Sequence, residues 1–155
     1  GATPETLTGA RTIDAAGVAE LIASGGPLLL LDVGPADRRP PSLAPDAVWM
    51  PAHRSIPGAT WLPGAGLGTD DPAYAAAFRD RIATLTGGDL DRPIVVFCQP
   101  NCWGSWNAGK RLIGLGYRRV LWAPGGVDAW QAEHEVATVR ADPVWARAAP
   151  QGAPQ

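Results

Sequence analysis

The chain has 155 residues, of which 46% are hydrophobic and 18% are charged, and its formal net charge at pH 7 is −2. A chain of this length is expected to form one domain with a full hydrophobic core. The slightly acidic charge excludes the basic surface that nucleic acid or acidic lipid would require. No apolar run approaches the ~20 residues of a membrane-spanning helix, so we also expect no membrane span.

The ends of the chain differ in composition from its middle. We expect a lead-in over residues 1–11, one domain over 12–140, and a surface tail rich in alanine and proline over 141–155. Trp145 is expected to attach this tail to the domain. The chain begins with Gly1 rather than with methionine, which we interpret as processing that removed a signal peptide.

Strands and helices alternate along the predicted domain. Apolar runs predict the strands, while helical periodicity and capping residues predict the helices. In chain order we expect a strand at 12–14, a helix at 15–24, strands at 28–33 and 60–62, a helix at 72–85, a strand at 93–98, a helix ending near Leu115, a strand at 120–122 and a short helix from Asp128. This order predicts an α/β fold with a central parallel sheet of about five strands and helices on both faces.

Capping residues and apolar spacing define the longer helices. Asp14 and Asp71 are placed to cap the helices at 15–24 and 72–85, and Ser105 is placed to cap the third. Apolar residues three or four positions apart form the expected buried stripes, namely Val18, Leu21 and Ile22 in the first helix and Tyr74, Phe78, Ile82 and Leu85 in the second.

Two predicted strands carry residues suited to chemistry at their carboxyl ends. Asp32 lies at the end of one strand, and Cys98 is the last residue of another. Since ligands of parallel α/β sheets bind where strands end, we expect Asp32 and Cys98 to face one crevice. Residues 34–51 form a long proline-rich connection, and connections of this length are often functional.

The two cysteines occupy a single loop. A disulfide between Cys98 and Cys102 would close only a short loop, which favours a local chemical role over a framework role. The loop amides and the dipole of the following helix favour negative charge here, so we expect Cys98 to be the reactive thiol and Cys102 its partner. The other residues expected around the loop and its pocket are Gln99, Asn101, Trp103, Gly104, Ser105, Trp106, Asp32 and Arg54.

The cysteines also have structural interpretations. As an alternative, Cys98 could simply be a buried residue at the end of a strand. The pair is typical of a locked disulfide in an oxidising compartment. A metal site would need His53 and His134 to converge on the cysteines, and we expect neither a metal nor a cofactor.

The neighbouring residues leave similar alternatives open. Asp32 could orient the loop by accepting amide hydrogen bonds or could simply cap the strand end. Arg54 could supply the positive charge that the loop lacks. We interpret His53 as a structural hydrogen-bonding residue, because the sequence shows no partner for it. Trp103 and Trp106 could serve packing or cover a thiolate.

An ordered set of short motifs resembles a rhodanese-like domain over residues 12–135. The motifs are Leu31-Asp32-Val33, Ile56-Pro57-Gly58-Ala59, Ile94-Val95-Val96-Phe97-Cys98, Gly116-Tyr117-Arg118-Arg119-Val120, Gly125-Gly126 and Trp130. The resemblance implies sulfurtransferase-like chemistry on a small thiol or a sulfane-sulfur substrate. It also implies that the fold is a single rhodanese-like α/β domain.

A narrower resemblance rests on the segments around the cysteines. These are His53-Arg54-Ser55-Ile56-Pro57-Gly58, Leu85-Thr86-Gly87-Gly88-Asp89 and Cys98-x-x-x-Cys102-Trp103-x-Ser105-Trp106-Asn107-Ala108. They are similar to a bacterial rhodanese-like subfamily named for its cysteine–cysteine–tryptophan (CXXCW) motif and associated with catabolism dependent on pyrroloquinoline quinone (PQQ). The resemblance implies a periplasmic protein whose partner is a PQQ-dependent dehydrogenase or cytochrome c. Trp103 could then receive a planar partner such as a quinone.

The loop departs from the rhodanese pattern in two ways. It lacks the basic residues that bind anionic substrates, and Gly104 stands where the phosphatase relatives have the arginine of Cys-x5-Arg. Cys102 is an added thiol that would attack a persulfide on Cys98, release sulfide and form a disulfide. We therefore expect thiol–disulfide or sulfur-transfer chemistry, weak activity on thiosulfate and no phosphatase activity. The alternative is a non-catalytic accessory module for a quinoprotein dehydrogenase or its cytochrome, with a structural Cys98–Cys102 disulfide.

Overall fold

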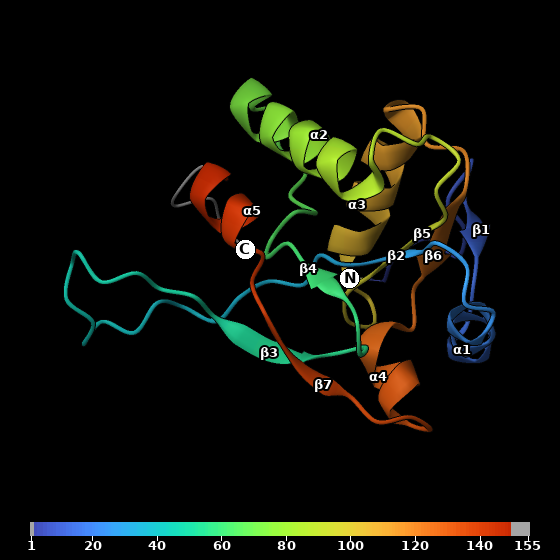
Figure 1. Ribbon diagram of the computed structural model, residues 1–155, viewed down its shortest axis with the longest axis horizontal. Coiled ribbons are helices and arrows are strands. Elements are labelled where there is room, and N and C mark those ends of the chain that lie inside the picture. Colours follow the sequence, from blue (N-terminus) through green and yellow to red (C-terminus); the bar gives the residue numbers. More distant parts are fainter. Residues whose placement is uncertain (1, 150–155) are drawn as a thin grey trace.

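The computed structural model describes residues 2–149, and residues 150–155 of the expected tail lie outside the described part. Its centre is a five-stranded parallel sheet in the order β1-β6-β5-β2-β4 (Figure 1). The strands are β1 (Arg11–Thr12), β2 (Leu29–Asp32), β4 (Thr60–Trp61), β5 (Ile94–Phe97) and β6 (Val120–Ala123). The expected α/β fold with five parallel strands is confirmed.

Helices cover both faces of this sheet. Figure 1 shows α2, α3 and α5 on one face and α1 and α4 on the other. The helices are α1 (Ala15–Ala23), α2 (Pro72–Thr86), α3 (Trp103–Gly114), α4 (Gly126–Gln131) and α5 (Pro143–Ala148). None of the helices between residues 2 and 149 has the length and apolar character needed to cross a membrane.

The middle strand β5 divides the hydrophobic core into two layers. Ile94 and Val96 belong to the layer under α2 and α3, whereas Val95 and Phe97 belong to the layer over α1 and α4. All four side chains are buried, since a parallel strand covered on both faces has no polar side. The cysteine loop begins directly after this strand, at the buried Cys98.

Two helix caps follow the sequence prediction and one does not. The side chains of Asp14 and Asp71 accept hydrogen bonds from amides of α1 and α2. The prediction that Ser105 caps the third helix is wrong, because Cys102 has extended backbone angles and α3 begins at the next residue. Ser105 is therefore buried within the first helical turn.

Two other predictions about helices need correction. Ile22 was expected in the buried stripe of α1 but is 37% exposed. The face of α1 that packs on the sheet is narrow, and it buries only Val18 completely. Helix α4 begins at Gly126 rather than at Asp128. The amide of Val127 is bonded to the Cys98 carbonyl, which fixes this early start.

A small second sheet was not predicted. Strands β3 (Ala52–Ser55) and β7 (Ala137–Arg140) pair antiparallel, with Arg54 opposite Thr138. Apart from the buried Ser55, their side chains alternate between half-buried and exposed, so neither segment has the apolar run by which a strand is recognised. Figure 1 shows this two-stranded ribbon of β3 and β7 extending beside the main sheet.

The described part of the C-terminal tail forms a short helix. Asp142 caps α5 and pairs with Arg81 of α2 at 2.7 Å. Trp145 is 1% exposed, its ring lies edge-on to Tyr74, and its indole N–H donates to the Pro63 carbonyl at 2.9 Å. Trp145 thus attaches the tail to the domain as expected, although the helix itself was not predicted.

We predict that Trp145→Ala lowers the free energy of unfolding by about 3–5 kcal/mol, because it leaves a cavity under α2 and removes the indole bond. Denaturant unfolding measures this change. Trp103→Ala is the control, since Trp103 is 42% exposed. That control should cost less than about 1 kcal/mol. Equal losses in the two variants would contradict the burial of α5 described above.

Candidate functional site

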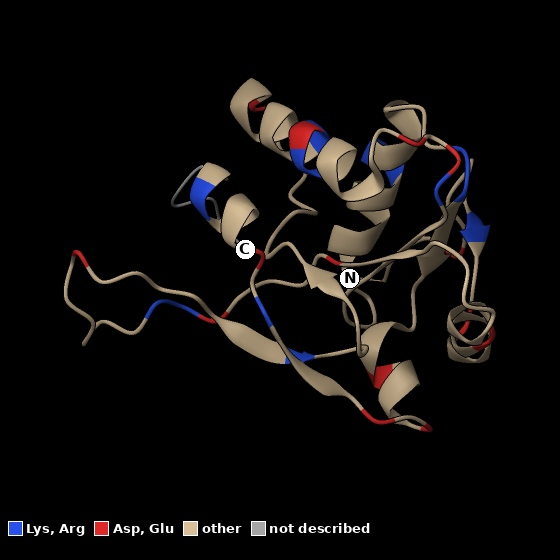
Figure 2. Ribbon diagram, viewed as in Figure 1, with Lys and Arg blue, Asp and Glu red and all other residues tan. Residues whose placement is uncertain are grey.

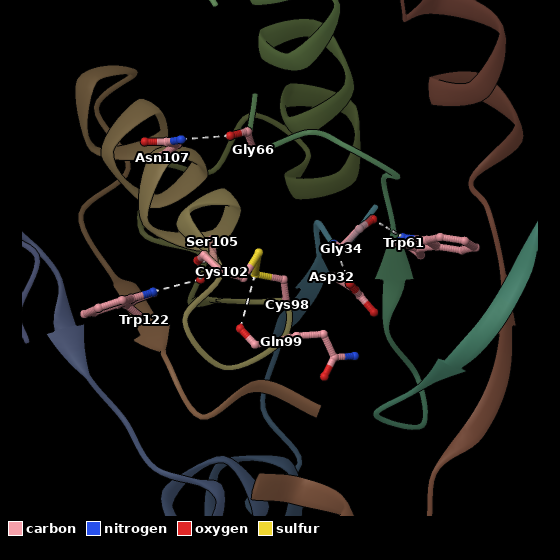
Figure 3. Close-up of a disulfide and its surroundings, with 10 residues drawn as sticks. All are labelled: Asp32, Gly34, Trp61, Gly66, Cys98, Gln99, Cys102, Ser105, Asn107 and Trp122. Atoms are coloured by element: carbon pink, nitrogen blue, oxygen red, sulfur yellow. Dashed lines mark hydrogen bonds between the residues drawn. A yellow bond between two sulfur atoms is a disulfide. The ribbon is translucent and has the colours of Figure 1, made fainter. Parts of the chain in front are cut away.

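The loop after β5 carries a disulfide between Cys98 and Cys102. The Cα atoms of the two residues are 6.3 Å apart, and the Cys102 amide donates to the Gln99 carbonyl at 3.2 Å to close a turn. Asn101 has a φ of 57°, which its short polar side chain tolerates. Figure 3 shows the disulfide between Asp32 and Gly34 on one side and Ser105 and Trp122 on the other.

The surroundings of the Cys98 sulfur differ from those expected. Cys98 is 1% exposed, and its Sγ lies 3.7 Å from the Gln99 carbonyl oxygen and 3.6 Å from the Cys102 carbonyl oxygen. Carbonyl oxygens carry partial negative charge, so both contacts disfavour a thiolate at Cys98. Among residues 2–149, no backbone amide donates a hydrogen bond to this sulfur. The predicted amide cradle is thus not formed around Cys98.

The Cys102 sulfur has the more favourable position for a thiolate. Cys102 is half-buried and occupies the N-cap of α3, where no side chain caps the first-turn amides. A Cβ placed on Gly104 would lie 3.2 Å from Cys102 Sγ, so this sulfur lies against the first turn of the helix. The free amides and the dipole of a helix N-terminus stabilise negative charge, which favours a thiolate at this position.

Two glycines allow neighbouring segments to contact the cysteine loop through backbone atoms. A Cβ on Gly126 would overlap the Cys98 carbonyl, which accepts the Val127 amide at 3.0 Å. A Cβ on Gly66 would overlap the backbone of Gly104 at the start of α3. The position of the disulfide is therefore fixed from both sides by main-chain contacts.

Tyr74 holds the segment that carries Gly66. Its hydroxyl donates to the Gly64 carbonyl, and burial raises the pKa of Tyr74 to about 12, so the hydroxyl stays protonated at neutral pH. On the other side of this segment, the Asn107 amide donates to the Gly66 carbonyl at 3.0 Å. Helices α2 and α3 thus both hold the covering segment in place.

Ser105 links the start of α3 to the sheet. Its Oγ accepts a hydrogen bond from the indole N–H of Trp122 at 3.0 Å and lies 3.4 Å from the Cys102 carbonyl oxygen. Trp122 belongs to β6 and is completely buried. Ser105 is therefore a buried support of the loop rather than a residue exposed in the pocket.

Asp32 forms a buried polar cluster at the end of β2. Its carboxyl group accepts the Gly34 amide at 2.8 Å, the Ser55 hydroxyl at 2.6 Å and His53 Nε2 at 2.8 Å. The His53 ring stacks on Trp61 with a centroid separation of 3.6 Å. Asp32 orients β3 and the turn at Gly34, whereas the loop amides expected as its partners make no bond to it.

The same cluster lies next to Cys98. A Cβ on Gly34 would lie 3.6 Å from His53 Cε1 and 3.9 Å from Cys98 Cβ. Asp32 Oδ1 is closer still to this position, at 3.1 Å, so Gly34 is packed between Asp32, His53 and Cys98. His53 has a partner, Asp32, which the sequence did not reveal because the two residues are 21 positions apart.

The remaining predicted residues lie in different places. Gln99 and Asn101 are exposed in the loop. Trp103 is exposed and lies edge-on to Trp106, whose indole N–H donates to the Thr6 carbonyl at 3.2 Å. Arg54 lines a depression with Gln131 and residues 134–138, beside the segment between α4 and β7, so the structure does not bring it to the cysteine loop.

The loop itself carries no charged side chain. Residues 98–109 include neither lysine nor arginine, and Figure 2 shows this part of the chain free of both charge colours. Lys110 lies 5.3 Å from the centroid of the Trp106 ring, and Arg111 donates to the carbonyls of Leu67 and Thr69. An anionic substrate would thus find no cationic side chain in the loop.

The histidines do not converge on the cysteines. His134 stacks on Trp130 at a centroid separation of 4.3 Å, whereas His53 stacks on Trp61. Between residues 2 and 149 there is no group of three histidine, cysteine, aspartate or glutamate side chains placed to hold a metal ion.

A family model matches most of the chain. The family model described as "Rhodanese-like domain" matches residues 14–133, which is more than half of the chain. No curated protein matches the sequence.

Several solved structures share the fold at low identity. The rhodanese-like domain of an Anabaena sp. protein is 22% identical with a TM-score of 0.54, covering 94% of this chain and 88% of that one. A yeast protein tyrosine phosphatase of the rhodanese family is 17% identical with a TM-score of 0.55, covering 83% and 88%.

A thiosulfate sulfurtransferase from Pseudomonas aeruginosa is 21% identical with a TM-score of 0.52 over 83% of this chain. This chain spans only 20% of that protein. Identities at this level show a common fold.

We predict that Gly66→Ala destabilises the protein and loosens the disulfide loop, because the added methyl group overlaps the Gly104 backbone. The expected loss is about 1–3 kcal/mol or more, and denaturant unfolding measures it. Gly26→Ala is the matched control, since a Cβ there meets nothing within 4 Å. If both variants were as stable as the parent protein, the close approach of the two backbone segments would be refuted.

Proposed function

Because this chain belongs to the rhodanese-like domain family, we propose that its Cys98–Cys102 pair performs thiol–disulfide or sulfur-transfer chemistry. The observation that carries the proposal is the disulfide whose two sulfurs lie in unlike surroundings. One sulfur is buried against carbonyl groups, and the other is half-buried at the N-terminus of α3. Because Cys98 is buried and Cys102 is half-buried, an incoming nucleophile reaches the Cys102 sulfur, and Cys98 is then the sulfur that leaves.

In the redox reaction, an external thiolate attacks Cys102 Sγ and forms a mixed disulfide. The bond between the two cysteine sulfurs breaks, and Cys98 Sγ takes the electron pair and then a proton. A second external thiolate attacks the external sulfur of the mixed disulfide and releases Cys102 as a thiolate. The protein is reduced by two electrons, and the two external thiols leave as one oxidised disulfide.

In the sulfur-transfer reaction, the reduced pair starts the cycle. A cysteine thiolate attacks the sulfane sulfur of a substrate, forms a persulfide and expels the rest of the substrate with its electron pair. The second cysteine then attacks the inner sulfur, which closes the disulfide and releases the outer sulfur as sulfide. An external thiol must reduce the disulfide before the next cycle, so both reactions use the same exchange step.

The charge of the loop favours a neutral or thiol substrate over a dianion. The segment from Cys98 to Gly109 has no cationic side chain. A bound thiosulfate or phosphate would therefore lose its charge-assisted hydrogen bonds. The arginine of the phosphatase pattern is replaced by Gly104, so the similarity of fold to a phosphatase is not expected to extend to activity.

We further propose that the protein works in the periplasm beside a PQQ-dependent dehydrogenase or its cytochrome c. The support is the resemblance of the segments around His53, Gly87 and Cys98 to the cysteine–cysteine–tryptophan subfamily. An oxidising compartment also preserves a disulfide that has one accessible sulfur. The test is to locate the protein by cell fractionation in a bacterium that makes it. Recovery with cytoplasmic proteins would reject this placement.

A second candidate function is a non-catalytic accessory module. The exposed ring of Trp103, placed edge-on to Trp106 beside the disulfide, favours contact with a protein partner or a planar molecule. In this case the disulfide would serve to hold the start of α3. The two functions differ in whether the disulfide exchanges with thiols while the protein stays folded.

We predict that dithiothreitol reduces the disulfide in the folded protein and that oxidised glutathione restores it. Mass spectrometry counts the thiols, and circular dichroism checks the fold. With oxidised glutathione, reduced Cys98→Ser should form a mixed disulfide roughly tenfold or more faster than reduced Cys102→Ser, because Cys102 lies at the helix N-terminus. A disulfide that opens only on unfolding would favour the accessory function instead.

We predict weak sulfurtransferase activity with thiosulfate, since no cationic side chain of the loop binds the dianion. Thiocyanate formation from thiosulfate and cyanide measures this activity. Introducing one cation in the loop, as in Gln99→Arg at an exposed position, should increase the rate by roughly tenfold through a charge-assisted contact. A parent rate equal to that of an ordinary rhodanese would overturn the argument from charge.

A further inference from the structure

We propose that the cavity between α1 and the edge strand β1 binds an aliphatic carboxylate, whose charged end lies between Arg11 and Arg119. The cavity has a volume of about 570 Å³, which is within the range of cavities that hold small molecules. The inference does not depend on the chemistry of the cysteine pair. It gives the domain a ligand site at the end of the sheet opposite to the cysteine loop.

The cavity lies where β1, β5 and β6 begin. Arg11 is the first residue of β1, Val120 is the first residue of β6, and Pro93 directly precedes β5. All three residues line the cavity. Cys98 follows the other end of β5. The cavity is therefore separate from the site at the carboxyl ends of the strands.

Arg11 and Arg119 lie on the same face of the sheet. Arg11 is opposite Leu121 in the parallel pairing of β1 with β6. Arg119 is two positions before Leu121, so both side chains leave the strand on one side. The Arg119 carbonyl accepts the Ile94 amide at 3.0 Å, which extends the strand pairing to this residue. Leu121 belongs to the core layer over α1 and α4, so both arginines face the side that α1 covers.

Helix α1 forms the other wall of the cavity. Gly17, Glu20, Leu21 and Ser24 line it at the spacing of three or four residues that defines one helix face. A Cβ on Gly17 would lie 2.7 Å from Ile13 Cγ1, so the helix lies close to the end of β1. The cavity is thus bounded by a helix on one side and by the edge of the sheet on the other.

The apolar part of the lining is aliphatic. It comes from Ile13, Leu21, Pro93, Val120 and Leu121, and no aromatic residue between positions 2 and 149 lines the cavity. Leu21 and Pro93 are only half-buried, so part of this surface is in contact with water. An aliphatic chain placed against it would remove apolar surface from water on both partners.

The charge of the lining favours an anion. Arg118 donates two hydrogen bonds to Asp91, at 2.7 and 2.9 Å, so its guanidinium is already engaged. Within residues 2–149, Arg11 and Arg119 form no hydrogen bond and no ion pair. Glu20 contributes one negative charge to the lining. Two available guanidinium groups and one carboxylate therefore match a ligand with a single negative charge, and arginine binds a carboxylate in bidentate geometry.

A charged residue on an edge strand also has a simpler explanation. Strand β1 is the outermost strand of the sheet, and a charge on such a strand prevents other strands from pairing with it. That role requires neither a cavity nor a second arginine. Arg119 lies outside β1, on the same cavity, and this favours a binding site (Figure 2 shows the arginine colour both on β1 and in the loop before β6).

The test is a titration of the isotope-labelled protein with sodium hexanoate at constant ionic strength, followed by the amide shifts in nuclear magnetic resonance spectra. Acetate carries the charge without the chain, and hexanol carries the chain without the charge. We expect hexanoate to shift the amides of residues 9–13, 20–24 and 118–121. Acetate and hexanol should each bind about tenfold more weakly or less, because each lacks one half of the recognition.

Two variants test the arginines. Arg11→Gln and Arg119→Gln should each weaken hexanoate binding by about tenfold, because each removes a charge-assisted contact. Arg140→Gln is the matched control, since Arg140 is also an exposed arginine on a strand but does not line the cavity. Circular dichroism checks that the variants are folded. The comparison of the three probes uses the parent protein, so it decides the question even if a variant does not fold.

Equal hexanoate binding by the parent protein and by the Arg11→Gln and Arg119→Gln variants would overturn the inference. Hexanol that binds as tightly as hexanoate would do the same, as would shifts confined to other parts of the chain. Arg11 would then serve only to protect the edge of the sheet. These measurements use the oxidised protein, in which the two sulfurs are bonded to each other, so their outcome is independent of the proposed cysteine chemistry.

Discussion

The buried carboxyl group of Asp32 is the constraint on which the site depends. A carboxyl group without exposure is costly unless donors surround it, and three donors from two segments do so here. The amide of Gly34 turns the chain away from β2, and the side chains of His53 and Ser55 draw β3 against the end of the sheet. The small ribbon of β3 and β7 therefore owes its place to an interaction at the carboxyl edge of the sheet.

The cysteine loop is held in a different way, by main-chain contacts on both sides. Gly126 and Gly66 allow the turn before α4 and the segment after β4 to lie against backbone atoms of Cys98 and Gly104. Close backbone packing of this kind leaves little freedom to the loop. It also keeps the two sulfurs in different surroundings. The Cys98 sulfur is buried against carbonyl oxygens, and the Cys102 sulfur lies at the start of α3. The loop after β5 thus presents two sulfurs in unlike surroundings.

Much of the main sheet could be predicted from the sequence, because its signals are local. The apolar run at 94–97 and the caps Asp14 and Asp71 act within a few residues. The location of the cysteine loop followed from the same signals. The ribbon of β3 and β7 could not be predicted, since its two strands are short, half exposed and far apart in the chain.

The details of the site depend on contacts between distant residues. Asp32 and Cys98 were expected at neighbouring strand ends, but no local signal joins His53 to Asp32. The role expected for Ser105 as a cap failed because Cys102 takes the extended backbone that starts α3. Arg54 was expected to help the loop, yet it lies beside the segment after α4, because the pairing of β3 with β7 fixes its position.

The short spacing of the cysteines has a thermodynamic consequence. The two residues are four positions apart, and a disulfide that closes so small a loop restricts the unfolded chain only modestly. Chain-entropy models assign roughly 2 kcal/mol to such a loop, against roughly 5 kcal/mol for one of about a hundred residues. The caps, the buried sheet and the Asp32 cluster do not involve the sulfurs. On this argument we expect oxidation state and folding stability to be only weakly coupled, so that reduction of the disulfide would leave the tertiary structure in place.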